Sequence, residues 1–179
     1  DIESHGEYYG AGIGSGSNGS ATVTIYNGNI KAYGGYNGAG IGGGYNVDAT
    51  VTINNGDIKS YGGYGGVGIG SGSYGNAIVT INNGNIEAYG AGIGSSTSGN
   101  ATVNLYGGNI FAKGGIDAKD IGAGSYADAT VNDYRPGENN GTGTLLSEGS
   151  IIIVSIIGTV ALITAGVFIV LYIREKKKR

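Results

Sequence analysis

The sequence contains no cysteine, no methionine, no tryptophan and one proline among its 179 residues. Without cysteine the chain has neither disulfides nor thiolate metal sites, although many surface proteins fold without disulfides, so this absence does not decide the compartment. The near-absence of proline, together with glycines that do not fall at every third residue, excludes a collagen-like chain. A single histidine, His5, leaves little material for acid-base chemistry.

Basic residues are scarce outside the C-terminal end of the chain. The net charge is −3, and residues 174–179 hold five of the ten basic residues. The rest of the chain is therefore acidic, which disfavours nucleic acid as a partner.

Glycine, by contrast, is abundant, with 40 residues, and it recurs within a repeat. Residues 20–30 return in similar form at 48–58, 76–86 and 100–110. The isoleucine of the Gly-Ile-Gly motifs falls at Ile13, Ile41, Ile69, Ile93 and Ile121, so successive positions differ by 28, 28, 24 and 28. The short step arises because Tyr89 precedes Ile93 by four residues, whereas Tyr33 precedes Ile41 by eight. A period of this length predicts a solenoid in which one coil has lost four residues from a loop.

Each repeat contains the patterns of short strands. Residues 21–25 alternate apolar and polar side chains, which predicts a strand with Ala21, Val23 and Ile25 facing inward. An Asn-Gly turn at residues 27–28 precedes a second strand, and the Gly-Ile-Gly motif supplies a third. We expect residues 1–134 to form an all-β, parallel β-helix (solenoid) of about five coils.

The two ends of the repeat region differ. The chain begins within the pattern and without an initiator methionine, so we expect residues 1–134 to be the C-terminal part of a longer repeat array. At the other end Asp133 takes the inward position of Ile25, beside Arg135, which predicts a terminating coil. Residues 135–150 are polar and predict a flexible linker.

Residues 151–173 contain no charged side chain. As a helix they would measure about 34 Å, which predicts a C-terminal transmembrane α-helix. The basic residues 174–179 predict a cytosolic tail, with the repeats outside the cell at the plasma membrane. Ala161 and Ala165 form a small-xxx-small pair that favours a weak helix dimer. The final Lys-Lys-Lys-Arg also matches a dilysine retrieval signal.

No catalytic, cofactor or metal site is predicted. Residues 38–43 match the Gly-x-Gly-x-x-Gly motif of dinucleotide sites, but the motif recurs in variants along the repeat and no helix pattern follows it. The carboxylates do not recur at one position, so no acid-base pair can be assembled from these repeats. We expect a protein that is not an enzyme, with an active site on upstream coils as a remaining alternative.

Two kinds of outward side chain recur. The tyrosines Tyr33, Tyr61 and Tyr89, with Tyr36 and Tyr64 beside them, form a candidate ligand-binding row. Aromatic side chains among Asn and Ser suit the binding of sugars, whereas the structural alternative is that stacked rings shield the turns and stabilise neighbouring coils. Threonines such as Thr22 and Thr24 form a second series that resembles the threonine arrays of ice-binding solenoids, although strands favour outward threonine in any case.

Three Asn-x-Ser/Thr triplets are possible N-glycosylation sites, at Asn18, Asn100 and Asn140. Such triplets also arise by chance in a chain this rich in Asn, Ser and Thr. They would carry glycans only in a eukaryotic host.

The motifs Gly-Ala-Gly-Ile-Gly and Ile-Asn-Asn-Gly-Asn-Ile resemble glycine-rich repeats of large surface proteins in bacteria and parasitic protists. They are similar to the two short motifs of polymorphic membrane protein adhesins, whose passenger regions are β-helices. The resemblance covers residues 1 to about 134, with Ile or Leu where that family has the Phe of Phe-x-x-Asn, and the single hydrophobic anchor segment also differs. It implies adhesion but transfers no binding residue.

We therefore expect a membrane-anchored cell-surface protein that adheres to glycans or proteins of a host or matrix. The alternative is a non-binding spacer or surface-coat protein that projects an upstream domain, which could be an enzyme.

Overall fold

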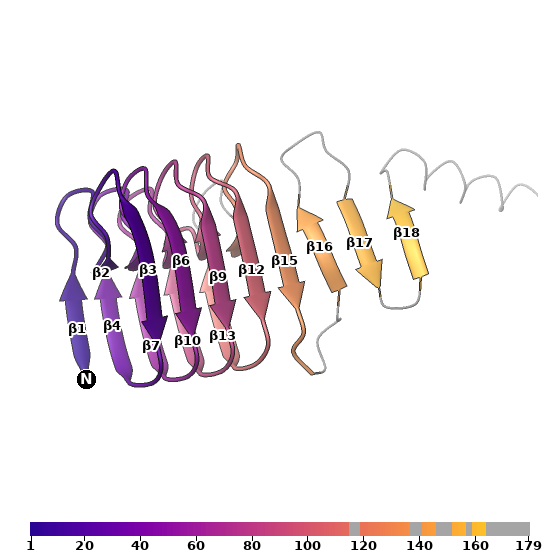
Figure 1. Cartoon of the computed structure of the whole chain (residues 1–179), viewed down its shortest axis with the longest axis horizontal. Helices are drawn as coiled ribbons and strands as arrows, with labels where there is room; N and C mark the ends of the chain where they lie inside the picture. The colour runs from indigo at the N-terminus through magenta and orange to yellow at the C-terminus, as the bar shows by residue number, and fades with distance from the viewer. Residues whose placement is uncertain (115–118, 137–140, 146–151, 157–158, 164–179) are drawn as a thin grey trace, which may run out of the picture.

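The chain winds short strands into a solenoid. The structure, a computed structural model, describes residues 1–114, 119–136, 141–145, 152–156 and 159–163. Over residues 1–136 each coil contributes one strand to each of three sheets, and every neighbouring pair in this part is parallel (Figure 1). The prediction of an all-β parallel β-helix of about five coils is confirmed for these residues.

The three sheets are named here A, B and C. Sheet A consists of β1 (Ile2–His5), β4 (Asn29–Tyr33), β7 (Asp57–Tyr61), β10 (Asn85–Tyr89) and β13 (Asn109–Lys113). Sheet B consists of β2 (Ile13–Gly14), β5 (Ile41–Gly42), β8 (Ile69–Ser71), β11 (Ile93–Ser95) and β14 (Ile121–Gly122). The parallel part of sheet C consists of β3 (Ser20–Ile25), β6 (Asp48–Ile53), β9 (Ala77–Ile81), β12 (Ala101–Leu105) and β15 (Ala129–Asp133).

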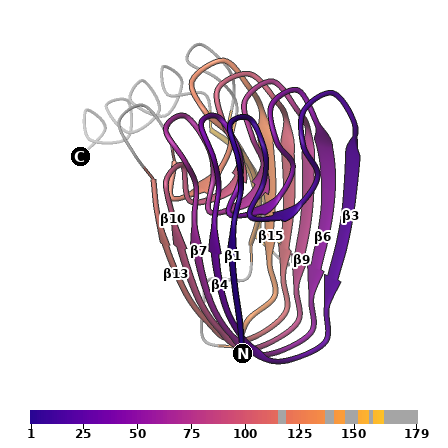
Figure 2. The same ribbon diagram turned by 90° about the vertical axis from the view of Figure 1, so that its left-hand side faces the viewer.

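Viewed from the N-terminal end, successive coils repeat the same outline, each displaced from the one before (Figure 2). Sheets A and C form two walls that meet at the narrow Asn-Gly turn, and sheet B with its loops closes the wide end (Figure 2). At that turn Gly28 and Gly56 have φ of 137° and 128°, a backbone conformation that favours glycine. In sheet B, a Cβ added to Gly70 would lie 1.9 Å from the carbonyl oxygen of Gly94, so a side chain does not fit between these coils.

The register follows the repeat read from the sequence. Val23 pairs with Val51 and Val51 with Val79, at the regular spacing of the repeat. Val79 pairs with Val103 across the shorter spacing, and Ile69 pairs with Ile93 in the same way. The four missing residues are therefore absorbed by the connection between β10 and β11, and the strands stay in register across the short coil.

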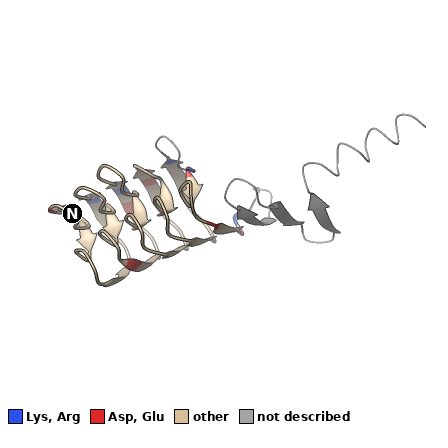
Figure 3. Cartoon of the chain, turned by 90° about the horizontal axis from the view of Figure 1, so that it is seen from above, with Lys and Arg blue, Asp and Glu red and all other residues tan. Residues whose placement is uncertain are grey.

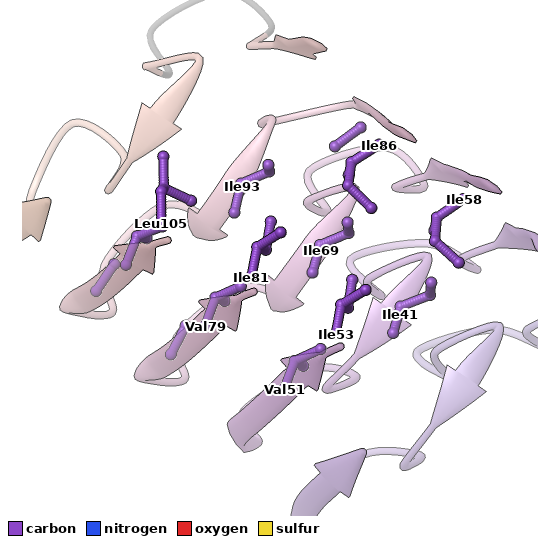
Figure 4. Packing of buried hydrophobic residues seen from close by; sticks show 14 of the residues in the cluster. Ile41, Val51, Ile53, Ile58, Ile69, Val79, Ile81, Ile86, Ile93 and Leu105 are labelled. Atoms are coloured by element: carbon purple, nitrogen blue, oxygen red, sulfur yellow. The ribbon is translucent and has the colours of Figure 1, made fainter. Parts of the chain in front are cut away.

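The core consists of inward apolar side chains stacked in rows along the axis. Ile41, Ile69 and Ile93 form one row, and each is fully buried (Figure 4). A second row comes from sheet C and consists of Ile53, Ile81 and Leu105. Of the three inward positions that the alternation predicted in residues 21–25, Ala21 and Ile25 are buried, and Val23 is partly buried and packs against the core. Burial of each large side chain contributes about 1.5–3 kcal/mol, and every coil extends the same rows.

The last parallel strand of sheet C carries a charge at an inward position. Asp133 pairs in register with Leu105, where the preceding coils have an apolar residue. Arg135 donates from its Nη2 to Asp133 Oδ2 at 2.6 Å, and from its Nε to Oδ1 at 2.9 Å. Hydrogen bonding by the guanidinium lowers the pKa of the Asp133 carboxyl below its usual value. The carboxylate at this end of the core is thus neutralised by a residue two positions away.

Beyond β15 the structure describes three further strands, which lie within the predicted linker and the predicted span. The strands β16 (Gly141–Leu145), β17 (Ile152–Ile156) and β18 (Thr159–Ile163) continue sheet C in antiparallel order. β16 lies in the predicted linker, 135–150, and β17 and β18 lie in the first part of the predicted transmembrane helix, 151–173. β17 consists mostly of isoleucine and valine, and β18 contains threonine, valine and isoleucine; such β-branched residues favour strands where a sheet edge such as β15 is available.

None of the described residues forms a helix of the length and hydrophobicity needed to cross a membrane. Residues 164–173, and with them Ala165 and the basic tail 174–179, lie outside the described residues. The membrane span, the tail and the linker therefore stay predictions of the sequence.

Candidate functional site: the tyrosine rows

The predicted tyrosines lie in two separate rows. Tyr33, Tyr61 and Tyr89 are the last residues of β4, β7 and β10, and we call them the strand row. Their rings stack at centroid distances of 4.9 and 5.0 Å, with interplanar angles of 8° and 6°. These distances match the spacing of about 4.8 Å between neighbouring strands, so the register of sheet A imposes the stacking.

The strand row extends beyond the predicted residues. His5 is in register with Tyr33 and stacks on it at 4.5 Å, while Phe111 contacts Tyr89 at 5.7 Å in a tilted arrangement. The sequence interpretation missed both, although His5 stands one regular repeat before Tyr33 and so carried the signal. Because each inner ring has a neighbour on both sides, Tyr61 presents only its edge and its hydroxyl to solvent.

Tyr36 and Tyr64 belong to another row, which lies in the loops between sheets A and B. Tyr8 stacks on Tyr36 at 5.3 Å and Tyr36 on Tyr64 at 5.3 Å; we call these three residues the loop row. Tyr8 and Tyr64, at the two ends, are 69% and 79% exposed, and Tyr36 is 42% exposed. The rings of the loop row are therefore far more accessible than those of the strand row.

Further tyrosines adjoin the loop row without any periodic signal. Tyr9 contacts Tyr8 at 4.3 Å and Tyr45 at 4.8 Å, and Tyr45 in turn contacts Tyr74 at 5.5 Å. The spacing between Tyr45 and Tyr74 exceeds the repeat by one residue, so counting along the sequence does not bring them together. Their contact depends on the path of the loops, which the sequence analysis did not predict.

Charged side chains occupy the centre of the outer face of sheet A. Glu3, Lys31, Lys59 and Glu87 follow one another in register. Lys59 Nζ lies 3.0 Å from Glu87 Oε1, and the Tyr89 hydroxyl donates to Glu87 Oε2 at 3.0 Å. The ammonium group of Lys59, and then the hydroxyl of Tyr89, lower the pKa of Glu87. Figure 3 shows that the coils otherwise carry few charged residues.

A polar groove of about 460 Å³ runs along the narrow turn, at the opposite end of sheet A from the strand row. It is lined by Asn27, Asn55, Asp57, Asn83, Asn85 and Asn109 with glycines between them. Amide side chains bond from coil to coil here, since Asn85 Nδ2 donates to Asp57 Oδ1 at 2.6 Å and Asn109 Nδ2 to Asn85 Oδ1 at 3.0 Å. These bonds link Asp57, Asn85 and Asn109 of three successive coils.

The outer face of sheet C carries the threonines. Thr24, Thr52 and Thr80 are in register and are followed by Asn104 and Asn132, which are joined by a hydrogen bond of 2.7 Å. The neighbouring series is interrupted by Ile78, which is 51% exposed. The threonine series thus covers only part of this face.

Two of the three glycosylation triplets can be placed. Asn18 is exposed at a φ of 58°, and its Oδ1 accepts a hydrogen bond of 3.1 Å from Asn46. Asn100 is exposed, and its Oδ1 accepts from the backbone N–H of Asp128 at 3.0 Å. Asn140 lies outside the described residues.

The only histidine lies in the strand row, where His5 Nε2 is 3.5 Å from Glu3 Oε1. In the described part of the chain, no three residues of the types His, Cys, Asp and Glu are grouped so that they could hold a metal ion. The expectation that the chain has no catalytic, cofactor or metal residues stays a prediction.

Comparison with known proteins supports the architecture. A family model described as a β-helix repeat matches residues 23–45 and 79–97. This match and the solenoid of three parallel sheets together support a β-helix repeat architecture. Both matched stretches begin in sheet C and end in or beside sheet B, so each spans the narrow turn and one tyrosine of the strand row. No curated protein and no solved structure matches the chain.

Proposed function

We propose that this β-helix repeat protein is a non-enzymatic cell-surface adhesin whose tyrosine rows bind glycans or proteins of a host or matrix. The observation that carries the proposal is the regular display of aromatic rings, about one coil apart, on loops and strand ends of a rigid scaffold. Rows of equivalent sites suit a repetitive ligand, because several weak contacts made at once give a high overall affinity.

The chemistry of the rows fits sugars. A tyrosine ring offers an apolar face with partial negative charge, to which the weakly positive C–H groups of a sugar are attracted, and its hydroxyl offers a hydrogen bond. The exposed rings Tyr8 and Tyr64 supply such faces, while Tyr89 and Glu87 supply polar groups at the edge of the strand row. We therefore favour glycans over proteins as the ligand.

A passive spacer is the second candidate function, and the strand row favours it. Tyr33, Tyr61 and Tyr89 are partly buried, and their ring faces are closed by one another. Each stacked pair contributes about 0.5–1.5 kcal/mol, which stabilises the coils without a ligand. In this case the repeats would act as a spacer or coat that projects another domain.

Attachment to the plasma membrane is part of the proposal and rests on the sequence. Residues 151–173 carry no charge and are followed by the basic residues 174–179, which supports a single span with the repeats outside and the C-terminus in the cytosol. Ala161 and Ala165 would then favour a weak dimer of spans, and Asn18, Asn100 and Asn140 would be accessible to glycosylation. Extraction of the expressed chain at alkaline pH tests this part: an integral protein stays in the membrane pellet, and release into the supernatant would contradict the anchor.

A binding comparison of the two rows tests the adhesin. The full chain in detergent is applied to a glycan array and to cells, alongside the triple variants Tyr33/Tyr61/Tyr89→Ala and Tyr8/Tyr36/Tyr64→Ala. Circular dichroism establishes that each variant is folded. We expect binding by the native chain and its loss in at least one folded triple variant. Absence of binding by the folded native chain would contradict the adhesin and favour the spacer.

A further inference from the structure

The loop row ends abruptly at the short coil. In the first full coils, the loops from sheet A to sheet B stack on one another by backbone hydrogen bonds: Tyr9 N–H donates to Tyr36 O at 3.1 Å and Asn37 N–H to Tyr64 O at 2.8 Å. Each donor thus points from one coil to the next. Gly65 occupies the equivalent position in the third loop, one regular repeat after Asn37.

The next connection is too short to continue this pattern. Residues 90–92 join β10 to β11, and they rejoin the preceding loop at its edges, where Gly62 N–H donates to Tyr89 O at 2.8 Å and Ala91 N–H to Gly66 O at 2.9 Å. The four residues that the sequence lacks are those that would lie against the loop tip between Gly62 and Gly66. One ring and one backbone donor are left uncovered as a result.

The ring is that of Tyr64. One of its faces stacks on Tyr36 at 5.3 Å and 17°, so the other face is directed along the axis toward the place of the missing loop. The residue is 79% exposed, and within the described coils no other ring contacts it. A flat apolar face is therefore presented at the end of an ordered stack.

The donor is the N–H of Gly65, which has no hydrogen-bond acceptor in the part of the chain that the structure describes. Its direction follows from the carbonyl of the same peptide group, Tyr64 O, which accepts from Asn37 N–H at 2.8 Å in the preceding coil, so the N–H on the opposite side points toward the missing loop. The next carbonyl, Gly65 O, is held by Ser73 Oγ at 2.9 Å and Ser96 Oγ at 2.5 Å. Ser73 and Ser96 are 3% and 4% exposed. Gly65 also has a φ of 71°, and a Cβ there would lie 2.3 Å from Asn37 Oδ1, so a side chain does not fit at this position.

A further hydroxyl lies at the same place. Thr97 is exposed, and its Oγ1 lies 3.5 Å from Ser96 Oγ, the atom that donates to Gly65 O. The loop tip thus combines an open aromatic face, a directed N–H donor and a hydroxyl that can both donate and accept. Buried serines hold this arrangement, so it is formed before any ligand arrives.

We call the open loop tip formed by Tyr64, Gly65 and Thr97 the notch. We propose that the notch is a subsite for one hexopyranose residue, which stacks its C–H face on Tyr64 and accepts a hydrogen bond from Gly65 N–H. The inference rests on the proposed glycan-binding function and assigns it to one place. A pyranose ring takes the position of the missing tyrosine-bearing loop, about 5 Å from the Tyr64 ring, as the next ring of the row would do. An aromatic side chain of a protein would use the ring face but would leave the N–H donor unpaired, which favours the sugar.

The notch can be removed in two independent ways. Tyr64→Ala deletes the platform, and Tyr26→Ala is a matched control because Tyr26 is 77% exposed and follows the end of β3, away from these loops. Insertion of Gly-Ala-Gly-Gly between Gly90 and Ala91 instead restores the regular spacing of the repeat. The inserted loop covers the Tyr64 face and supplies an acceptor for Gly65 N–H while leaving every native residue in place.

The test uses the full chain in detergent with 13C-labelled tyrosine rings, titrated with methyl hexopyranosides and, separately, with N-acetylphenylalanine amide. We expect the Tyr64 ring signal to shift with at least one hexopyranoside. Affinity should fall about tenfold or more in Tyr64→Ala and in the insertion variant and should be unchanged in Tyr26→Ala. Thermal unfolding of each variant establishes that the coils remain folded.

The outcomes separate the subsite from the general function. Glycan binding that survives in both the folded Tyr64→Ala and insertion variants would overturn the subsite and leave the adhesin intact. A native chain that binds no glycan on the array or in the titration would overturn both. If the Tyr64 ring signal shifts only with the phenylalanine amide, the proposal that the notch binds a sugar is overturned and the notch is assigned to a protein partner.

Discussion

The strand row and the loop row contain the same kind of stacked tyrosine, yet they differ in what they expose. The strand row continues into the short coil, because Tyr89 precedes the missing residues and keeps its register with Tyr61. The loop row stops there, and Tyr64 is left with one open face. The comparison teaches that a repeat stabilises itself where it continues and becomes available to a ligand where it is interrupted.

The largest expected loss of stability comes from a substitution in the hydrophobic core that supports both rows. Ile81 is fully buried between Ile53 and Leu105, so Ile81→Ala leaves a cavity and should lower the free energy of unfolding by about 2–5 kcal/mol. Urea denaturation followed by circular dichroism measures the loss. Both rows should lose their order in one transition, and near-ultraviolet signals that melt separately would contradict a common scaffold.

The next effect distinguishes the two rows directly. Tyr61→Ala removes stacking with both Tyr33 and Tyr89, so it should lower the free energy of unfolding by about 1–3 kcal/mol. Tyr64→Ala removes one stacking partner at an exposed site and should cost less than about 1 kcal/mol. Chemical denaturation of both variants measures the difference, with Tyr61→Phe as the control that keeps the stack. Equal losses would mean that the two rows play the same structural part.

The smallest expected effect is a change of stability with pH, and it should involve only the strand row. Glu87 accepts from Tyr89 and pairs with Lys59, and these partners lower its pKa in the folded chain. Its contribution to stability is therefore present above its unfolded pKa of about 4.3 and is lost as the pH falls through the lower folded value. Because the pair is exposed and screened by salt, the change should be slight.

NMR signals of labelled tyrosine rings measure this effect. The Tyr89 signal should move as the pH falls below about 4.3, while the Tyr64 signal should stay constant. In Glu87→Gln the Tyr89 signal should no longer follow the pH. A titration of Tyr64 in the same range would show that the rows are coupled.

Much of the fold could be predicted from the sequence because every coil of a solenoid repeats the same pattern of strands and turns. The alternation in residues 21–25 identified the side chains that face the core, and the steps of the repeat, including the short one, identified the strand pairs. The strand row followed from the same counting. Each of these features depends only on the period and on the two faces of a strand.

The features that the sequence did not reveal depend on loop paths and on competing structures. Tyr45 and Tyr74 meet although their spacing departs from the repeat, and the open face of Tyr64 depends on where residues 90–92 rejoin the preceding loop. In β17 and β18 a run of apolar, β-branched residues pairs as strands, although its length and lack of charge also suit a membrane helix. Hydrophobicity alone does not separate these two structures.

The most direct test asks whether the strands keep register across the coil that lacks four residues. Because the chain has no cysteine, pairs can be introduced without interference. Thr52/Thr80→Cys probes a regular step, Thr80/Asn104→Cys probes the short step, and Thr52/Asn104→Cys is the control, two coils apart. Neighbouring strands lie about 4.8 Å apart, within the reach of a disulfide, whereas two coils exceed the limit of about 7 Å. We predict rapid oxidation of the first two pairs and none of the third. Failure of Thr80/Asn104→Cys to form a disulfide would contradict the register on which the open face of Tyr64 depends.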